Sequence, residues 1–190
     1  YWRNGPVLNN AISGVDQALW DIKGKRAGMP VYQLLGGKCR EAAACYTHIN
    51  GKDYGEIGEH IHAFREQGYQ HIRIQLGGYG GKTEDLHKPE GAPAGAYFDP
   101  RQYMRAHLNL FEKVRGEVGF EVELLNDVHE RLRPIEAVEY AKDLEQFKLY
   151  FLEDPLAPED LELFQNIRQQ TSTPIAMGEL FNHPREWQPL

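Results

Sequence analysis

Three acidic residues recur at equal spacing in the second half of the chain, each close to the end of a short apolar run. Asp127, Glu153 and Glu179 are 26 residues apart, in the runs EVELLND (121–127), LYFLED (149–154) and PIAMGE (174–179). Stretches with helical character follow the first two runs. A parallel α/β barrel returns each strand end to the same face. The spacing therefore predicts that the three carboxylates meet at one end of a parallel sheet.

Carboxylates that meet at one face repel each other unless a cation lies between them. An oxygen-only ligand set suits a hard divalent ion, and Mg²⁺ is the expected one. Any single carboxylate at a strand end has a simpler interpretation as a helix cap or an ion pair. Three at equal spacing favour a shared metal site over that interpretation.

The length of the chain limits how much of a barrel it can form. Its 190 residues suffice for one domain with a real core. A complete (β/α)₈ barrel needs about 250 residues, so we expect a partial barrel. The chain begins at Tyr1 and ends in REWQPL just after a predicted strand, and we interpret it as part of a longer protein.

Composition excludes several classes of partner. The net charge is −7 and no arginine-rich run appears, so nucleic acid is not expected to bind. No apolar run approaches 18 residues, and no membrane span is expected. Cys39 and Cys45 lack the spacing of a zinc or redox motif, which predicts buried free thiols in a cytoplasmic protein.

Hydrophobic periodicity gives the order of the elements. An amphipathic helix is predicted over 8–27, where Leu8, Ile12, Val15, Leu19 and Ile22 share one face. The remaining predictions, in chain order, are a helical turn at 30–35, a strand at 42–47, a helix at 56–68, a strand at 71–76 and a helix at 100–117 before the first acid-ended strand. Helices at 134–147 and 158–170 separate the three acid-ended strands. This alternation predicts an α/β fold.

The segment 77–99 is rich in glycine and has no clear period. A loop of this length in a compact domain is usually a lid or a binding loop. Its GGYGG run (77–81) lacks the surrounding residues of a phosphate-binding motif, so we interpret the glycines as loop flexibility.

Polar side chains accompany the predicted strand ends. His48 follows the first strand, Arg73 and Gln75 alternate on the second, and Asp127 and His129 alternate on the third. Alternate residues of a strand point to the same side. Because the carboxyl ends of barrel strands carry the active site in known barrel enzymes, these residues are the candidates for one site.

Longer motifs cover nearly the whole chain: SGVDQALWDIKGKRAGMPVYQLLGG (13–37), YTHING (46–51), IRIQ (72–75), LLNDVHERLRPIEA (124–137), FLEDPLAPED (151–160) and TPIAMGELFN (173–182). As a set they resemble the enolase superfamily and, within it, the mannonate dehydratase group of sugar-acid dehydratases. The resemblance implies a modified TIM barrel of (β/α)₇β type. Residues 1–40 would be the linker and helix that follow an N-terminal capping domain, and residues 41–190 the first five βα units.

The resemblance also implies roles for the candidate residues. Asp127, Glu153 and Glu179 would bind Mg²⁺, His129 would be the general acid, and Arg73 would lie beside the base. Substrate contacts would come from His48, Gln75, His129 and Glu179. The implied activity is a hydro-lyase reaction on a mannonate- or gluconate-type sugar acid: α-proton removal, enediolate stabilisation and loss of the β-hydroxyl, which yields a 2-keto-3-deoxy acid.

The general base is the point of departure from that group. There the base is a tyrosine in the loop after the second strand, activated by the neighbouring arginine. The loop in this chain does not match the usual one, and Tyr79 is the nearest candidate. Neither position 73 nor position 75 is a lysine, which argues against a racemase with a lysine base.

Two other functions stay open. The altered loop is compatible with a catalytically silent, metal-binding protein with a sensing or regulatory role. Another enolase-type reaction, such as epimerisation, is the second alternative. The expected partner is a small sugar acid, and the group generally forms homo-oligomers.

Overall fold

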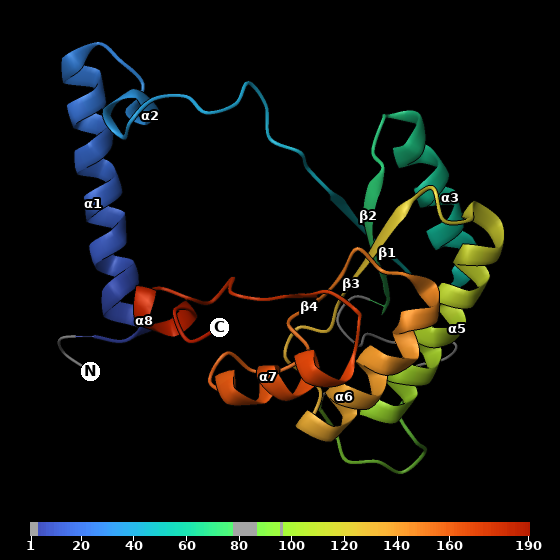
Figure 1. Cartoon of the computed structure of the whole chain (residues 1–190). Helices are drawn as coiled ribbons and strands as arrows, with labels where there is room; N and C mark the ends of the chain where they lie inside the picture. The colour runs from blue at the N-terminus through green and yellow to red at the C-terminus, as the bar shows by residue number, and fades with distance from the viewer. Residues whose placement is uncertain (1–3, 78–86, 96) are drawn as a thin grey trace. The chain divides into compact units, whose positions relative to one another are not determined.

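Five parallel strands follow one another in the sheet in the same order as in the sequence. The computed structural model describes residues 4–77, 87–95 and 97–190 (Figure 1). The strands are β1 (Thr47–Gly51), β2 (His71–Leu76), β3 (Glu123–Asp127), β4 (Phe151–Glu153) and β5 (Ile175–Ala176). Consecutive parallel strands joined by helical crossovers form a partial TIM barrel, as the acid spacing predicted.

The chain divides into two units. One contains residues 45–178, with the whole sheet, and residue 190. The other contains residues 1–44 and 179–189, with α1 (Pro6–Ala27), α2 (Val31–Leu34) and α8 (Pro184–Trp187). Each unit is described by itself below.

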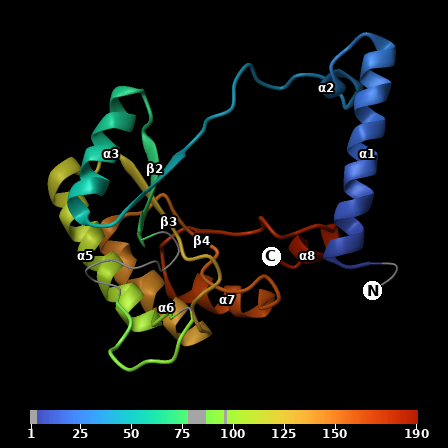
Figure 2. The same cartoon turned by 180° about the vertical axis from the view of Figure 1, so that it is seen from behind.

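Helices of the sheet unit line one face of the strands (Figures 1 and 2). They are α3 (Tyr54–Glu66), α5 (Pro100–Val118), α6 (Pro134–Asp143) and α7 (Leu161–Gln170), with a 3₁₀ turn, η1 (Leu144–Phe147), after α6. Asp53 caps α3 through the amide of Glu56, and Asp99 caps α5. Proline at the first position of α5 and α6 has no amide that needs a partner there.

The core lies between this helix layer and the sheet. In β2, Ile72, Ile74 and Leu76 are buried, whereas His71 and Arg73 on the alternate side are only partly so. The helices contribute buried apolar residues to the same cluster, including Ile57, Ile61, Phe111, Leu110, Ala137, Tyr140 and Phe164. Alternate residues of a strand point to opposite faces, so Arg73 points away from this cluster.

Arg115 fastens the amino-terminal ends of the strands to α5. Its guanidinium donates to four backbone oxygens: Phe147 at 2.8 Å, Gly119 at 2.9 Å, Val122 at 2.7 Å and Lys148 at 3.0 Å. Its side chain is buried, and burial lowers the pKa of the guanidinium from its ordinary value. The residue satisfies backbone acceptors that precede β3 and β4.

The amino-terminal unit is built on one long helix. α1 ends at Gly28, whose φ of 66° is the left-handed cap that glycine favours. Four of the five members of the predicted apolar face are more than half exposed, namely Ile12 55%, Val15 63%, Leu19 58% and Ile22 56%, whereas Leu8 is half-buried. Asn9 of α1 donates to Asn182 at 3.0 Å, which ties α1 to the segment before α8.

Two predictions about residues 39–47, between α2 and β1, were wrong. The first strand is not 42–47 but Thr47–Gly51, and residues 42–46 are irregular. Cys39 and Cys45 are exposed rather than buried. The ladder between β1 and β2 starts at Thr47, so only the last residue of the predicted strand belongs to the sheet.

The predicted bounds of the other elements agree with the structure to within a few residues. The helix predicted over 158–170 begins at Leu161, and the one over 134–147 divides into α6 and η1. Residues 78–86 and 96 of the predicted lid lie outside the described residues. Across residues 4–77, 87–95 and 97–190, no helix is long and apolar enough to cross a membrane.

Candidate active site

Two acidic side chains meet at the carboxyl ends of β3 and β4. The parallel register places Asp127 directly beside Glu153. Neighbouring parallel strands lie about 4.8 Å apart, so residues in register bring their side chains close together. The side chains of Asp127 and Glu153 are only 3% and 14% exposed. Two carboxylates this close and this buried require a positive partner.

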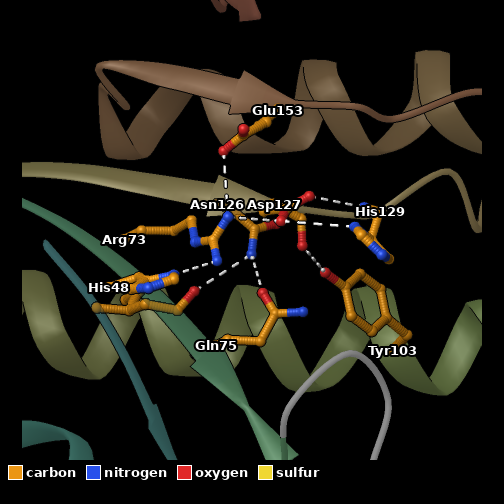
Figure 3. A network of polar contacts seen from close by, with 9 residues as sticks. His48, Arg73, Gln75, Tyr103, Asn126, Asp127, His129 and Glu153 are labelled. Atoms are coloured by element: carbon orange, nitrogen blue, oxygen red, sulfur yellow. Dashed lines mark hydrogen bonds and ion pairs between the residues drawn. The ribbon is translucent and has the colours of Figure 1, made fainter. Parts of the chain in front are cut away.

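Arg73 supplies that positive charge in the described structure. Its Nη1 lies 2.6 Å from Asp127 Oδ2 and 3.4 Å from Glu153 Oε2 (Figure 3). Arg73 pairs with Leu125, two residues before Asp127, so its long side chain extends along the sheet to the strand ends. One guanidinium nitrogen therefore faces both carboxylates.

His48 is the second partner of this guanidinium. Arg73 Nη2 contacts His48 Nδ1, and the register of β1 and β2 pairs the two residues directly. His48 is the second residue of β1, not a residue beyond the end of that strand as the sequence suggested. It still reaches the site because its neighbour in the sheet is Arg73.

His129 is held beside Asp127 by the turn after β3. Its backbone amide donates to Asp127 Oδ1 at 2.9 Å, and its imidazole Nδ1 lies 3.8 Å from Asp127 Oδ2. His129 and the next residue, Glu130, have φ angles of 57° and 66°. This left-handed conformation is uncommon for residues other than glycine, and clusters at functional sites. The turn directs a partly exposed imidazole to the same carboxylate that Arg73 contacts.

The turns after β3 and β4 are joined by backbone hydrogen bonds. The amide of Val128 donates to Glu153 O at 3.0 Å, and the amide of Glu130 donates to Asp154 O at 2.7 Å. Asp154 also has a positive φ, 41°. The candidate acid and the candidate metal ligand are therefore carried on one connected backbone structure.

A buried polar network that sequence reasoning missed lies beneath these strand ends. Asn126 Nδ2 donates to Gln75 Oε1 at 3.2 Å, and Tyr140 of α6 donates to Asn126 Oδ1 at 2.9 Å. Tyr103 of α5 donates to the backbone oxygen of Asp127 at 3.3 Å (Figure 3). Burial raises the pKa of both tyrosine hydroxyls, so they act as donors. The network fixes the backbone that carries Asp127.

His107 belongs to the same support. Its Nδ1 donates to Tyr103 O at 2.9 Å, and its Nε2 accepts from the amide of Leu76 at 3.2 Å, which sets the tautomer. Burial lowers the pKa of His107 to about 4, so the imidazole is neutral at pH 7. The sequence signal for this role was weak, because a histidine on an outer helix can face either solvent or sheet.

Gln75 contributes a buried donor to the site. Its side chain is 3% exposed, and its Nε2 has no hydrogen-bond partner within the described part of the chain. A buried donor without a partner costs about 1–3 kcal/mol, so such groups usually serve a ligand or water. The position of Gln75 beside Arg73 on β2 is compatible with a ligand oxygen.

Two of the predicted site residues are not part of this assembly as described. Glu179 follows β5 but belongs to the other unit, so its meeting with Asp127 and Glu153 stays a prediction. Tyr79 lies outside the described residues. Within residues 4–77, 87–95 and 97–190, no three acidic, histidine or cysteine side chains form a complete metal-binding group.

The donors that do meet fit a hard divalent cation. Carboxylate oxygens of Asp127 and Glu153 converge on one point that already holds a positive nitrogen. Oxygen-only coordination is what Mg²⁺ prefers. The fold and site thus define an α/β-barrel protein with a carboxylate centre at the carboxyl end of its strands.

Comparison with known sequences gives the family. Residues 56–190 match the enolase C-terminal domain-like family, and residues 2–36 match the mandelate racemase/muconate lactonizing enzyme N-terminal domain. The first match covers more than half of the chain, which belongs to the enolase C-terminal domain-like family.

Curated relatives are D-galactonate dehydratase family members. A D-galactonate dehydratase family member of Enterocloster bolteae is 54% identical over 194 residues, covering 100% of this chain and 48% of the relative. The family member RspA of Pantoea ananatis is 53% identical over 207 residues, covering 100% of this chain and 50% of the relative. The chain thus spans about half the length of these curated relatives.

Solved structures share the fold. An enolase from Pantoea ananatis, with bound D-gluconate and Mg, aligns with a TM-score of 0.89 at 51% identity, over 100% of this chain and 50% of that one. The 3,6-anhydro-D-galactonate cycloisomerase of Zobellia galactanivorans aligns with a TM-score of 0.73 at 29% identity, over 95% of this chain and 44% of that one.

Proposed function

We propose that the protein carrying this chain dehydrates a sugar acid of the mannonate or gluconate type in a Mg²⁺-dependent reaction and yields a 2-keto-3-deoxy acid. The observation that carries the proposal is the convergence of Asp127, Glu153, Arg73 and His129 at the carboxyl ends of the strands. The gluconate and Mg bound by the Pantoea ananatis enolase, 51% identical over this whole chain, support the same substrate class and metal.

Asp127, Glu153 and Glu179 are the proposed metal ligands. Mg²⁺, when bound, stabilises negative charge on the substrate carboxylate as the α-proton is lost. The side chains of the first two ligands are 3% and 14% exposed and lie on residues adjacent in the sheet, which holds them in place before the ion arrives. We propose that residues 1–40 complete a capping domain and that Glu179 joins the ligands from the end of the fifth strand.

His129 is the proposed general acid. Its side chain is 41% exposed, so the imidazole can exchange protons with water and face a substrate above the strand ends. Asp127 orients it through the hydrogen bond to its backbone amide. A positioned acid that protonates a departing hydroxyl contributes about 10²–10⁴-fold to the rate.

Three further residues at the strand ends are proposed to help bind the substrate and activate the base: Arg73, His48 and Gln75. The guanidinium supplies positive charge at the strand ends, His48 holds that guanidinium from β1, and Gln75 offers its free amide donor to a substrate oxygen. Tyr79, which lies outside the described residues, remains the proposed base because it is the first tyrosine after Arg73 in the segment that follows the second strand.

A screen of aldonic and aldaric acids against the intact protein with Mg²⁺ tests the proposal, with 2-keto acid formation as the readout. Glu153→Gln should abolish turnover, and EDTA should abolish it reversibly. The proposal fails if no acid in the library is dehydrated. Deuterium uptake at the α-carbon without loss of water would select epimerisation, and binding without turnover would select a sensing role.

A further inference from the structure

Arg73 makes its contacts with the very oxygens that the proposed metal would use. Its Nη1 lies 2.6 Å from Asp127 Oδ2 and faces Glu153 Oε2 at 3.4 Å, and its side chain is only 11% exposed. The other oxygen of Asp127 already accepts the amide of His129. Both the guanidinium and a metal ion would therefore draw on Asp127 Oδ2.

We infer that Arg73 is an internal counter-ion that competes with Mg²⁺ for Asp127 and Glu153. Mg²⁺ binds carboxylate oxygen at about 2.0–2.1 Å, closer than the guanidinium nitrogen. Two cations that share one buried oxygen repel each other strongly, because the surroundings screen them poorly. Metal binding must then displace Nη1 from the carboxylates. This inference rests on the metal site of the proposed function.

The displaced guanidinium has a second partner on the opposite side. Nη2 contacts His48 Nδ1, and the two residues are paired in the ladder of β1 and β2. Asp127 and Glu153 lie on β3 and β4, so release from them leaves Arg73 anchored on the β1 side. Occupation of the metal site would in this way free the positive charge for a ligand or base at the end of β2.

The same contacts give Arg73 a role in the metal-free protein, where it holds Asp127 and Glu153 together. Asp127 and Glu153 are neighbours in register and both largely buried, so without a counter-ion they would repel each other. The guanidinium keeps them together and keeps the ligand pair formed. The affinity for Mg²⁺ is the balance between this pre-organisation and the competition, and the competition is the larger effect for a doubly charged ion.

Calorimetric titration of the intact, EDTA-treated protein with Mg²⁺ tests the inference. Arg73→Gln removes the charge and should bind Mg²⁺ about tenfold more tightly than the wild type, which corresponds to about 1.4 kcal/mol. Arg73→Lys keeps the charge and should stay within about threefold. Arg105→Gln, on the exposed side of α5, is the matched control for net charge and should not change the affinity.

Thermal unfolding gives a second readout that does not depend on activity. Arg73→Gln should melt below the wild type in EDTA and gain more from added Mg²⁺. If the variant does not fold in EDTA, it can be purified with Mg²⁺ and its affinity measured by competition with a chelator. Equal or weaker Mg²⁺ binding by Arg73→Gln overturns the inference alone. If neither the wild type nor the variant binds Mg²⁺, the metal site and the inference are both overturned.

Discussion

The backbone of the turn after β3 positions His129 at the strand ends. Its φ of 57° and that of Glu130, 66°, cost free energy that only the surrounding contacts recover. Those contacts are the bond from its amide to Asp127 and the bond from Glu130 to Asp154. The turn thus lowers stability somewhat and places the imidazole at the strand ends.

His129→Asn should lower kcat by about 10²–10⁴-fold, because the acid that protonates the leaving hydroxyl is lost. Asparagine tolerates the left-handed conformation, so the turn and Asp127 should keep their places. Steady-state turnover of the best sugar acid and Mg²⁺ affinity would be measured together. His62→Asn, on the exposed side of α3, is the control. A kcat within a few-fold of wild type would remove His129 from the mechanism.

His107 predicts a dependence of stability on pH. Its pKa is lowered to about 4 by burial, whereas an unfolded histidine has a pKa near about 6.5. Between these values the unfolded state binds a proton that the native state does not. The stabilising contribution is therefore complete above about pH 6.5 and lost as the pH falls, by about 2 kcal/mol between pH 7 and pH 5.

Urea unfolding of the wild type and His107→Gln at pH 7 and pH 5 isolates this contribution. Glutamine offers both a donor and an acceptor but does not titrate, so the variant should lose about 2 kcal/mol less than the wild type over this interval. An equal loss in the two proteins would show that His107 is not buried in the neutral form.

α5 connects the two ends of the sheet. Near its start, Tyr103 and His107 bond to the backbone at the carboxyl ends of β3 and β2, and near its end Arg115 bonds to carbonyls at the opposite side. Pro100 and the Asp99 cap fix where the helix begins. One helix therefore holds the backbone at both ends of the strands that bear the site.

Arg115→Met should lower the free energy of unfolding by about 3 kcal/mol or more, because it leaves buried carbonyls without donors. Methionine keeps much of the side-chain volume, so the loss reports the hydrogen bonds. Denaturant unfolding measures it, with Arg105→Met on the exposed side of the same helix as the control. A loss below about 1 kcal/mol would mean that water replaces the guanidinium.

The elements that the sequence predicted well are those with a strong period. HIRIQL became β2 at its predicted bounds because alternate residues pack on α3 and α5. Asp127 and Glu153 meet because regular βα units repeat the register. The prediction of a strand at 42–47 was wrong because strand formation depends on a neighbouring strand, and a local sequence pattern does not show which strand that will be.

The support of the site was harder to predict than the site. Polar residues on three different elements form this support: Tyr103 and His107 on α5, Asn126 on β3 and Tyr140 on α6. Their contacts depend on which side of each helix faces the sheet, and the hydrophobic pattern assigns that side from apolar residues only. A search for polar residues on the apolar faces of α5 and α6 would have found them.

The sheet has two edge strands, β1 and β5. β1 and β5 each pair with one strand only among the described residues. Large apolar side chains on α1 are exposed as well. The chain spans about half the length of its curated relatives, and unpaired strand edges promote association between molecules.

Expressed alone, the 190-residue chain should therefore associate and bind a hydrophobic dye such as ANS. Size-exclusion chromatography with light scattering measures the mass. The intact protein is the comparison, and it should bind much less dye per mole. A monodisperse monomer without dye binding would contradict the expectation, since it would mean that the strand edges and α1 are covered within this chain.

The bonds between the turns after β3 and β4 have a mechanical consequence. Val128 and Glu130 donate to the backbone of Glu153 and Asp154, so neither turn can open without breaking the other's contacts. Amide hydrogens of Val128 and Glu130 should then exchange with deuterium at one common rate, as members of one cooperative opening unit. The acid and the metal ligand would leave and regain their working positions together, so that a half-assembled centre is rarely populated.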